Sequence, residues 1–122
     1  MESIKLFHVE DNEGDALIVR EMLRYVKNLH VELSHVATLA DAKDQLSSSN
    51  YDILLLDLGL PDSFQFSALE EILEMKPSQC VIVLTGPEGH EKGIEAVKTG
   101  ADDYLSKNVI TPYSLERPSC SV

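Results

Sequence analysis

The sequence predicts a doubly wound α/β domain, in which helices cover both faces of a parallel sheet. Five short apolar runs alternate with four amphipathic segments along the 122 residues. The strongest run, Ile53 to Leu56, contains no polar residue, which is typical of a parallel strand that is buried on both faces. Strict alternation of strands and helices favours right-handed crossover connections between parallel strands. We therefore expect one domain over residues 1–122, with a core of about residues 4–110.

In the first half of the chain, we expect two strands and two helices. The strands are expected at Ile4 to Val9 and at Val31 to Val36. Asn12 is a good N-cap for the first helix, and Thr38 with Asp41 resembles a capping box for the second. The apolar residues at helical spacing are Val19, Met22, Leu23 and Val26 in the first helix, and Leu39, Ala42 and Leu46 in the second.

The second half repeats the alternation. The strands are expected at Ile53 to Leu56, Val81 to Leu84 and Asp103 to Ser106. The third helix carries Phe66, Leu69, Ile72 and Leu73. It ends at Lys76, before a proline. The fourth helix is expected to turn Ile94 and Val97 inward and to end at Gly100, a C-cap glycine. Two prolines in 111–122 predict that a fifth helix is short or absent.

Composition narrows the class of protein. Twenty-one acidic and ten basic side chains give a formal charge of −11, which argues against direct binding of nucleic acid and favours a cation or a basic partner. No apolar stretch approaches the length of a membrane helix, and a strand that starts at Ile4 leaves no room for a signal peptide. Cys80 and Cys120 show neither metal-ligand spacing nor a dense disulfide pattern. We therefore expect a cytoplasmic location.

Polar side chains follow the ends of the expected strands. Glu10 and Asp11 come after the first strand, Asp57 after the third, Thr85 after the fourth and Lys107 after the fifth. The carboxyl ends of parallel strands share one edge of a sheet, where open α/β sheets bind ligands. Three neighbouring carboxylates repel one another unless a cation or a proton compensates them, and Mg²⁺ prefers such oxygen ligands.

These residue types suit phosphoryl transfer to Asp57, with Asp57 as the nucleophile. Mg²⁺, the Lys107 ammonium and the Thr85 hydroxyl would each meet one phosphoryl oxygen, and Gly86 would leave space for the incoming group. Each residue also has a simpler interpretation. Glu10 and Asp11 would cap a helix, Lys107 would be a solvated surface lysine, and Thr85 would be an ordinary strand residue. The combination of all these residues favours the metal site.

Four motifs in order resemble the receiver domain of two-component response regulators, across about Ile4 to Ile110. They are Val-Glu-Asp-Asn at 9–12, Leu-Asp-Leu-Gly-Leu-Pro-Asp at 56–62, Val-Leu-Thr-Gly at 83–86 and Gly-Ala-Asp-Asp-Tyr-Leu-Ser-Lys at 100–107. The resemblance implies a flavodoxin-like sheet with strand order 2-1-3-4-5. It also implies that Asp57 accepts a phosphoryl group from a histidine kinase or a histidine phosphotransfer protein.

The resemblance further assigns roles to individual residues. Asp11, Asp57 and the Gly59 carbonyl would ligate Mg²⁺, and Glu10 would act through water. Thr85 and Tyr104 would form a switch pair that alters the face of the fourth helix, the fifth strand and the fifth helix. Such a domain catalyses only its own phosphorylation and dephosphorylation and is not a metabolic enzyme. It acts on an output domain or an effector protein.

Some positions depart from the family pattern. Asn108 stands where a proline with a cis peptide is common, Gln65 where glycine is frequent, and Pro87 stiffens the loop after Thr85. Asn108, Pro87 and the short C-terminus motivate an alternative, a degenerate receiver that binds partners without phosphorylation. A phosphatase of the haloacid dehalogenase type would need an acid two residues after the nucleophile, where this chain has Gly59.

The remaining polar and aromatic candidates are expected to be structural. His8 lies within the first strand and is expected to pack in the core. The other histidines, His30, His35 and His90, share no ligand spacing. The phenylalanines Phe7, Phe64 and Phe66 are also expected to pack.

Overall fold

A computed structural model describes residues 2–25, 29–64, 66–86 and 90–106. Strands and helices alternate through these residues. The strands are β1 (Glu2–Val9), β2 (Leu29–Val36), β3 (Ile53–Asp57), β4 (Val81–Thr85) and β5 (Asp103–Ser106). The helices are α1 (Glu13–Leu23), α2 (Leu39–Ser48), α3 (Ser67–Met75) and α4 (His90–Thr99). The predicted doubly wound α/β fold is confirmed.

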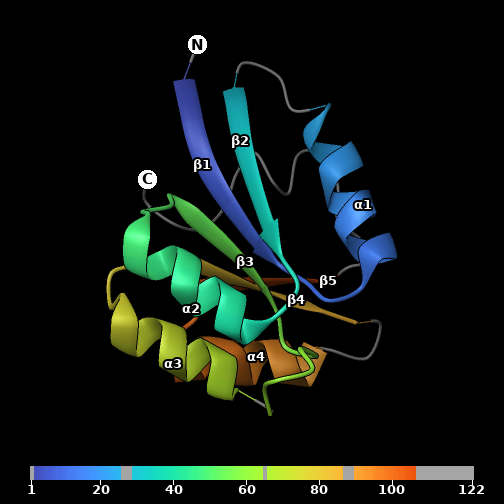
Figure 1. Cartoon of the computed structure of the whole chain (residues 1–122). Coiled ribbons are helices and arrows are strands. Elements are labelled where there is room, and N and C mark those ends of the chain that lie inside the picture. Colours follow the sequence, from blue (N-terminus) through green and yellow to red (C-terminus); the bar gives the residue numbers. More distant parts are fainter. Residues whose placement is uncertain (1, 26–28, 65, 87–89, 107–122) are drawn as a thin grey trace.

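The five strands form one parallel sheet in the order β2-β1-β3-β4-β5, as the family resemblance implied. Figure 1 shows α2, α3 and α4 together on one face of this sheet and α1 on the other. Helices on both faces explain why β3 and β4 are apolar up to their last residues, because every residue of both strands is buried.

Alternation along the central strand divides the core in two. Leu54 and Leu56 pack in the cluster beneath α2 and α3, whereas Ile53 and Leu55 pack in the cluster that contains Val19 of α1. Successive side chains of a strand point to opposite faces of the sheet, so one uninterrupted apolar run supplies both clusters. Packing buries both faces of β3, and the ladder pairings of β3 with β1 and β4 set the register of Asp57 at its end.

The predicted caps are confirmed. The Asn12 side chain accepts a hydrogen bond from the Asp15 amide at 3.0 Å, and the Thr38 side chain accepts one from the Asp41 amide at 3.1 Å. Gly100 follows α4 with a φ of +137°, a conformation that side chains disfavour. Local signals in the sequence therefore set where these helices begin and end.

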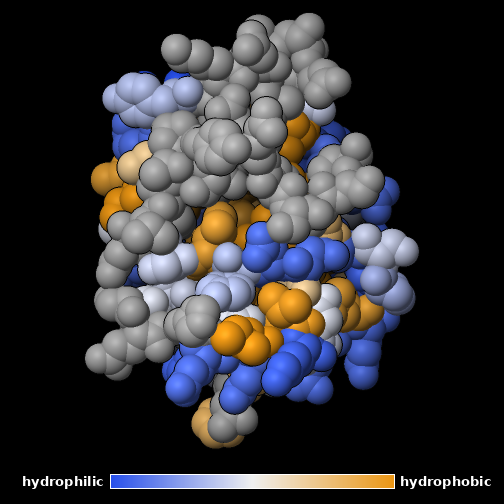
Figure 2. Space-filling model, turned by 180° about the vertical axis from the view of Figure 1, so that it is seen from behind, coloured by the Kyte–Doolittle hydropathy of each residue, from blue (hydrophilic) through white to orange (hydrophobic). Residues whose placement is uncertain are grey.

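The predicted inward face of α4 is wrong. Ile94 and Val97 are 40% and 41% exposed, whereas Gly93 and Ala96 are buried. Small residues let the α4 backbone approach the sheet, and the bulkier side chains are left on the outer side. Figure 2, a view from behind, shows hydrophobic residues at the surface in patches among hydrophilic ones.

Several expectations lie outside the described residues. They concern Val26, Gln65, Pro87, the peptide between Lys107 and Asn108, and a fifth helix in 111–122. Within the described ranges, no helix has the length and apolar character that a bilayer span requires.

Asp62 connects the segment after β3 to the start of α2. Its carboxylate accepts hydrogen bonds from the amides of Leu39 and Ala40 at 2.8 and 2.9 Å. These two bonds hold the pKa of Asp62 below its ordinary value of 3.8, since they favour the charged form. The carboxylate also satisfies amides that a helix start leaves unpaired, next to the positive end of the helix dipole.

Asp62→Asn is therefore expected to destabilise the domain near neutral pH. A pKa that is lower in the folded than in the unfolded state gives stability that is fully present above the unfolded pKa and is lost as pH falls through the folded one. The difference in urea midpoint between wild type and Asp62→Asn should shrink as pH falls from 6 to 3. Asp44→Asn, an exposed change within α2, is the control; an equal response from both variants would contradict the capping role of Asp62.

Candidate functional site

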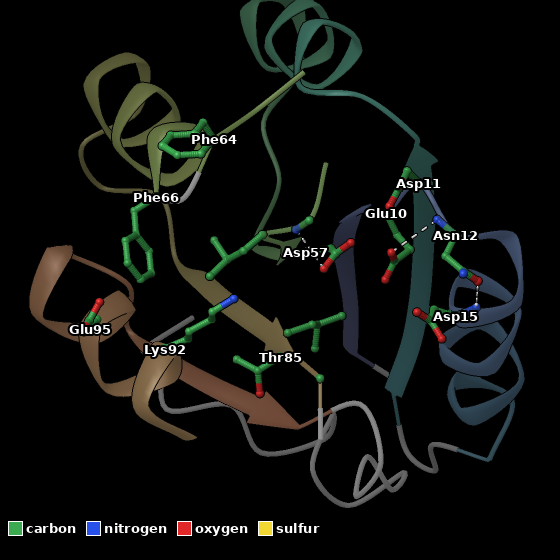
Figure 3. A pocket seen from close by; sticks show the side chains of 14 residues that line it. Glu10, Asp11, Asn12, Asp15, Asp57, Phe64, Phe66, Thr85, Lys92 and Glu95 are labelled. Atoms are coloured by element: carbon green, nitrogen blue, oxygen red, sulfur yellow. Dashed lines mark hydrogen bonds between the residues drawn. The ribbon is translucent and has the colours of Figure 1, made fainter. Parts of the chain in front are cut away.

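A cavity of about 720 Å³ opens at the carboxyl edge of the sheet. Its lining comes from the ends of β1, β3 and β4, from the segment between β3 and α3, and from α4. Figure 3 shows the labelled side chains converging on this space from opposite sides. In the observed strand order, the winding of the chain reverses between β1 and β3, and open α/β sheets bind ligands at such a point.

The strand register brings the acids together. Val9 of β1 pairs with Leu56 of β3, so the residues that follow them, Glu10 and Asp57, lie level on adjacent strands. Carboxylate oxygens of Glu10, Asp11 and Asp57 lie within 4.8 Å of one another. Glu10 and Asp57 are buried, whereas Asp11 is exposed. Three carboxyl groups thus meet at the end of a largely apolar sheet.

The donor set fits a hard divalent cation. Metal–oxygen distances of about 2.0 to 2.1 Å place neighbouring and opposite oxygens of an octahedral Mg²⁺ roughly 2.9 to 4.2 Å apart. The observed spread of up to 4.8 Å needs only a small contraction to reach this range. The Gly59 amide donates to Oδ1 of Asp57 at 3.3 Å, which keeps the following loop close to the carboxylate.

Glu10 is held by the backbone around it. Its amide donates to the Val36 carbonyl at 2.9 Å, and its carboxylate accepts from the Asn12 amide at 3.4 Å. His35 Nε2 lies 2.7 Å from the Glu10 carbonyl oxygen. His8 is fully buried, as expected, with Nε2 3.8 Å from a Glu10 carboxylate oxygen. Contacts on both sides of Glu10 therefore fix its position.

Thr85 closes β4 on the opposite side of the cavity from Glu10. Its side chain is buried, and its hydroxyl donates to the Leu105 carbonyl of β5 at 3.4 Å. A Cβ atom at Gly86 would meet nothing within 4 Å, so neighbouring protein atoms do not require glycine there.

Two further site residues, Tyr104 and Lys107, were expected from the sequence. Tyr104 lies on β5, is half-buried and packs against the core cluster on the α2, α3 and α4 side of the sheet. Lys107 lies outside the described residues. The structure therefore brings Glu10, Asp11, Asp57, Gly59 and Thr85 to one cavity.

Lys92 and Phe64 are among the lining residues that the sequence did not place at the site. Lys92 lines it, and Figure 3 shows the Lys92 side chain reaching from α4 into the space between Phe66 and Thr85. Phe64 also lines it and is 77% exposed, so the expectation that Phe64 packs in the core is wrong. Lys92 could have been found from topology, because a helix that follows a parallel strand begins at the carboxyl edge of the sheet.

The fold and the acidic edge define a class, the phosphoacceptor domains of signalling pathways. The family model for the response regulator receiver domain matches residues 6–116, and the chain belongs to this family. It is a receiver domain of two-component systems.

A relative from Escherichia coli (strain K12) is a protein-glutamate methylesterase/protein-glutamine glutaminase. It is 30% identical over 112 residues, which cover 88% of this chain and 31% of the relative. The chain thus spans about a third of the length of the curated relatives it matches.

Solved structures agree with the fold. A response regulator from Chloroflexus aurantiacus has a TM-score of 0.81 at 22% identity, over 93% of this chain and 92% of that one. The receiver domain of a sensor histidine kinase from Pseudomonas aeruginosa has a TM-score of 0.78 at 26% identity, with the same coverage. That structure holds a magnesium ion in its active-site cleft.

Proposed function

We propose that Asp57 is the phosphoacceptor of this receiver domain, in a reaction that requires Mg²⁺. The observation that carries the proposal is the cluster of carboxylates from Glu10, Asp11 and Asp57, within 4.8 Å of one another at the carboxyl edge of the sheet. Only Asp57 of the three ends the central strand β3, where ladder pairing with β1 and β4 sets its register. A positioned carboxylate is an established covalent nucleophile toward phosphorus.

The proposed step transfers a phosphoryl group from a phosphohistidine. A carboxylate oxygen of Asp57 attacks phosphorus, the new O–P bond forms as the P–N bond breaks, and the donor imidazole keeps the electron pair and takes a proton from solvent. Mg²⁺, held by Asp11, Asp57 and the Gly59 carbonyl, with Glu10 acting through water, would neutralise charge on a phosphoryl oxygen. The Lys107 ammonium and the Thr85 hydroxyl would contact the other two phosphoryl oxygens.

We further propose that Thr85 and Tyr104 transmit the change. Thr85 now donates to the Leu105 carbonyl, one residue beyond Tyr104 in β5. A phosphoryl group on Asp57 adds a charge of about −1.5 to −2 and several acceptor oxygens, which compete for this hydroxyl. Release of Thr85 from β5 would then alter the contacts of α4 and β5 that partners meet.

The partners follow from the donor chemistry. We propose a histidine kinase or a histidine phosphotransfer protein as donor, and an output domain or a separate effector as receiver of the signal. Cytoplasmic localisation is likewise proposed from the family. Cys80 is disulfide-bonded in the structure, so the cysteines do not by themselves support a reducing compartment.

Intact mass after incubation with phosphoramidate and Mg²⁺ tests the proposal. We expect a gain of one phosphoryl group on the wild type and on Asp44→Asn, a change on the exposed side of α2. The gain should disappear in Asp57→Asn and when a chelator removes Mg²⁺. Equal phosphorylation of wild type and Asp57→Asn would refute Asp57 as acceptor, and an unchanged rate in the chelator would refute the metal requirement.

A further inference from the structure

Gly93 is buried inside α4 and is the fourth residue of the helix. Glycine is the least favourable residue after proline within a helix, because it loses the most backbone freedom on folding. Among the described glycines, positive φ occurs at Gly100 and not at Gly93, so the backbone of Gly93 does not itself require glycine. The contact that Gly93 makes must supply the reason.

That contact is with the ring of Tyr104. A Cβ atom added at Gly93 would overlap Cγ and Cδ2 of the ring and would lie 2.6 Å from Cε2, closer than real Cβ contacts. One edge of the ring therefore lies directly against the α4 backbone. Because Cγ is the root of the ring, moving only its tip cannot relieve the overlap; the whole ring or the helix must shift.

The preceding residue of the same helical turn reaches the phosphoacceptor cavity. Lys92 lines that cavity, and Figure 3 shows its side chain directed into it. Residues 92 and 93 are adjacent in α4, so the helix contacts the cavity through one and the Tyr104 ring through the other. A change in the position of α4 would therefore alter its contact with the cavity and its contact with the Tyr104 ring.

We propose that Gly93 is a positioning residue for Tyr104: the ring lies against α4 only because residue 93 lacks a side chain, and this arrangement favours capture of a phosphoryl group at Asp57. The inference rests on the proposed function, with Thr85 and Tyr104 as its switch pair. A ligand that favours one ring orientation binds more tightly when that orientation is already populated. A substitution that lowers the population of this ring orientation lowers the apparent affinity for the ligand by the same factor.

The packing is tested by a double-mutant cycle. Gly93→Ala is expected to lower the urea midpoint in the wild type and in Tyr104→Phe, which keeps the ring. In Tyr104→Val, which leaves the space empty and suits a strand, the same change should raise the midpoint, as alanine normally does in a helix. Stabilisation by Gly93→Ala in all three backgrounds would overturn the proposal.

The functional consequence is read separately. In protein labelled with 3-fluorotyrosine, the ¹⁹F signal of Tyr104, assigned by its absence in Tyr104→Phe, should move in Gly93→Ala. Beryllofluoride, a phosphoryl mimic supplied with Mg²⁺, should bind Gly93→Ala at least tenfold more weakly than wild type. An unchanged ¹⁹F signal or an unchanged affinity would overturn the proposal while leaving Asp57 as the acceptor.

Failure of the proposed function looks different. If the wild type itself does not bind beryllofluoride and Asp57→Asn behaves like it, phosphoryl capture at Asp57 is refuted, and the coupling of Gly93 to that capture is refuted with it. If the wild type binds and Gly93→Ala binds equally well, only the inference about Gly93 fails.

Discussion

Asp57→Asn is expected to stabilise the metal-free domain while removing most of its response to Mg²⁺. The carboxylates of Glu10, Asp11 and Asp57 lie within 4.8 Å of one another, and two of the three residues are buried. At an effective dielectric constant of about 20, two unit charges about 5 Å apart repel by roughly 3 kcal/mol before salt screening. Allowing for screening and for the exposure of Asp11, we expect a gain of about 1 to 2 kcal/mol in the free energy of unfolding.

The metal response should change in the opposite direction. A ligand that binds only the folded state, at about 100 times its Kd, stabilises by roughly 2.7 kcal/mol. The wild type should gain about this much from saturating Mg²⁺, and Asp57→Asn should gain far less. Together, the two effects mean that the cluster of carboxylates lowers the stability of the metal-free domain and that the cation restores it.

Thermal unfolding with and without Mg²⁺ measures both effects. Asp44→Asn, an exposed change of the same type on α2, should follow the wild type in both conditions. Lower stability of metal-free Asp57→Asn would mean that hydrogen bonds to Asp57 outweigh the repulsion. A full Mg²⁺ response in the variant would place the cation elsewhere.

The site was predictable because its residues come directly after the strands. Apolar runs located β1, β3 and β4, and parallel order alone then required Glu10, Asp57 and Thr85 to share an edge. Backbone register, rather than any detail of side-chain packing, brings these residues together. The strand boundaries moved by only a few residues without affecting this result.

The face of α4 was not predictable in the same way. Ile94 and Val97 gave the apolar signal, yet Gly93 and Ala96 are the buried residues. Glycine and alanine contribute little to an apolar pattern, because they are buried to let backbones approach rather than for their own apolar area. Hydrophobic periodicity therefore reports the wrong face wherever a helix packs through small residues.

Long-range polar contacts were also missed. Asp62 was visible as part of a loop, but nothing local indicates that its carboxylate caps α2, 22 and 23 residues earlier in the chain. Lys92 was likewise visible as a helix residue, while its direction depends on where α4 begins relative to the cavity. Such contacts depend on how the elements are placed in space, which the spacing of residues in one element does not contain.

Leu54→Ala and Leu55→Ala are each expected to lower the free energy of unfolding by about 2 to 5 kcal/mol, since each removes a buried leucine side chain and leaves a cavity. Both leucines are 0% exposed, and they belong to different core clusters on opposite faces of β3. Similar losses of stability would show that both faces of β3 are packed in a solvent-excluded core. Leu17→Ala, at a residue that is 49% exposed on α1, should change stability by only about 0.5 kcal/mol.

Urea unfolding of the three variants distinguishes the possibilities. If Leu55→Ala lowers the free energy of unfolding no more than Leu17→Ala does, the α1 side of the sheet is not a solvent-excluded core. The conclusion that β3 is packed on both faces would then be wrong. Phosphorylation provides a second reading, because ladder hydrogen bonds to β1 and β4 set the register of Asp57 independently of any one leucine. Well below its unfolding midpoint, Leu55→Ala should therefore still take up one phosphoryl group, whereas loss of uptake in the folded variant would mean that core packing itself positions the acceptor.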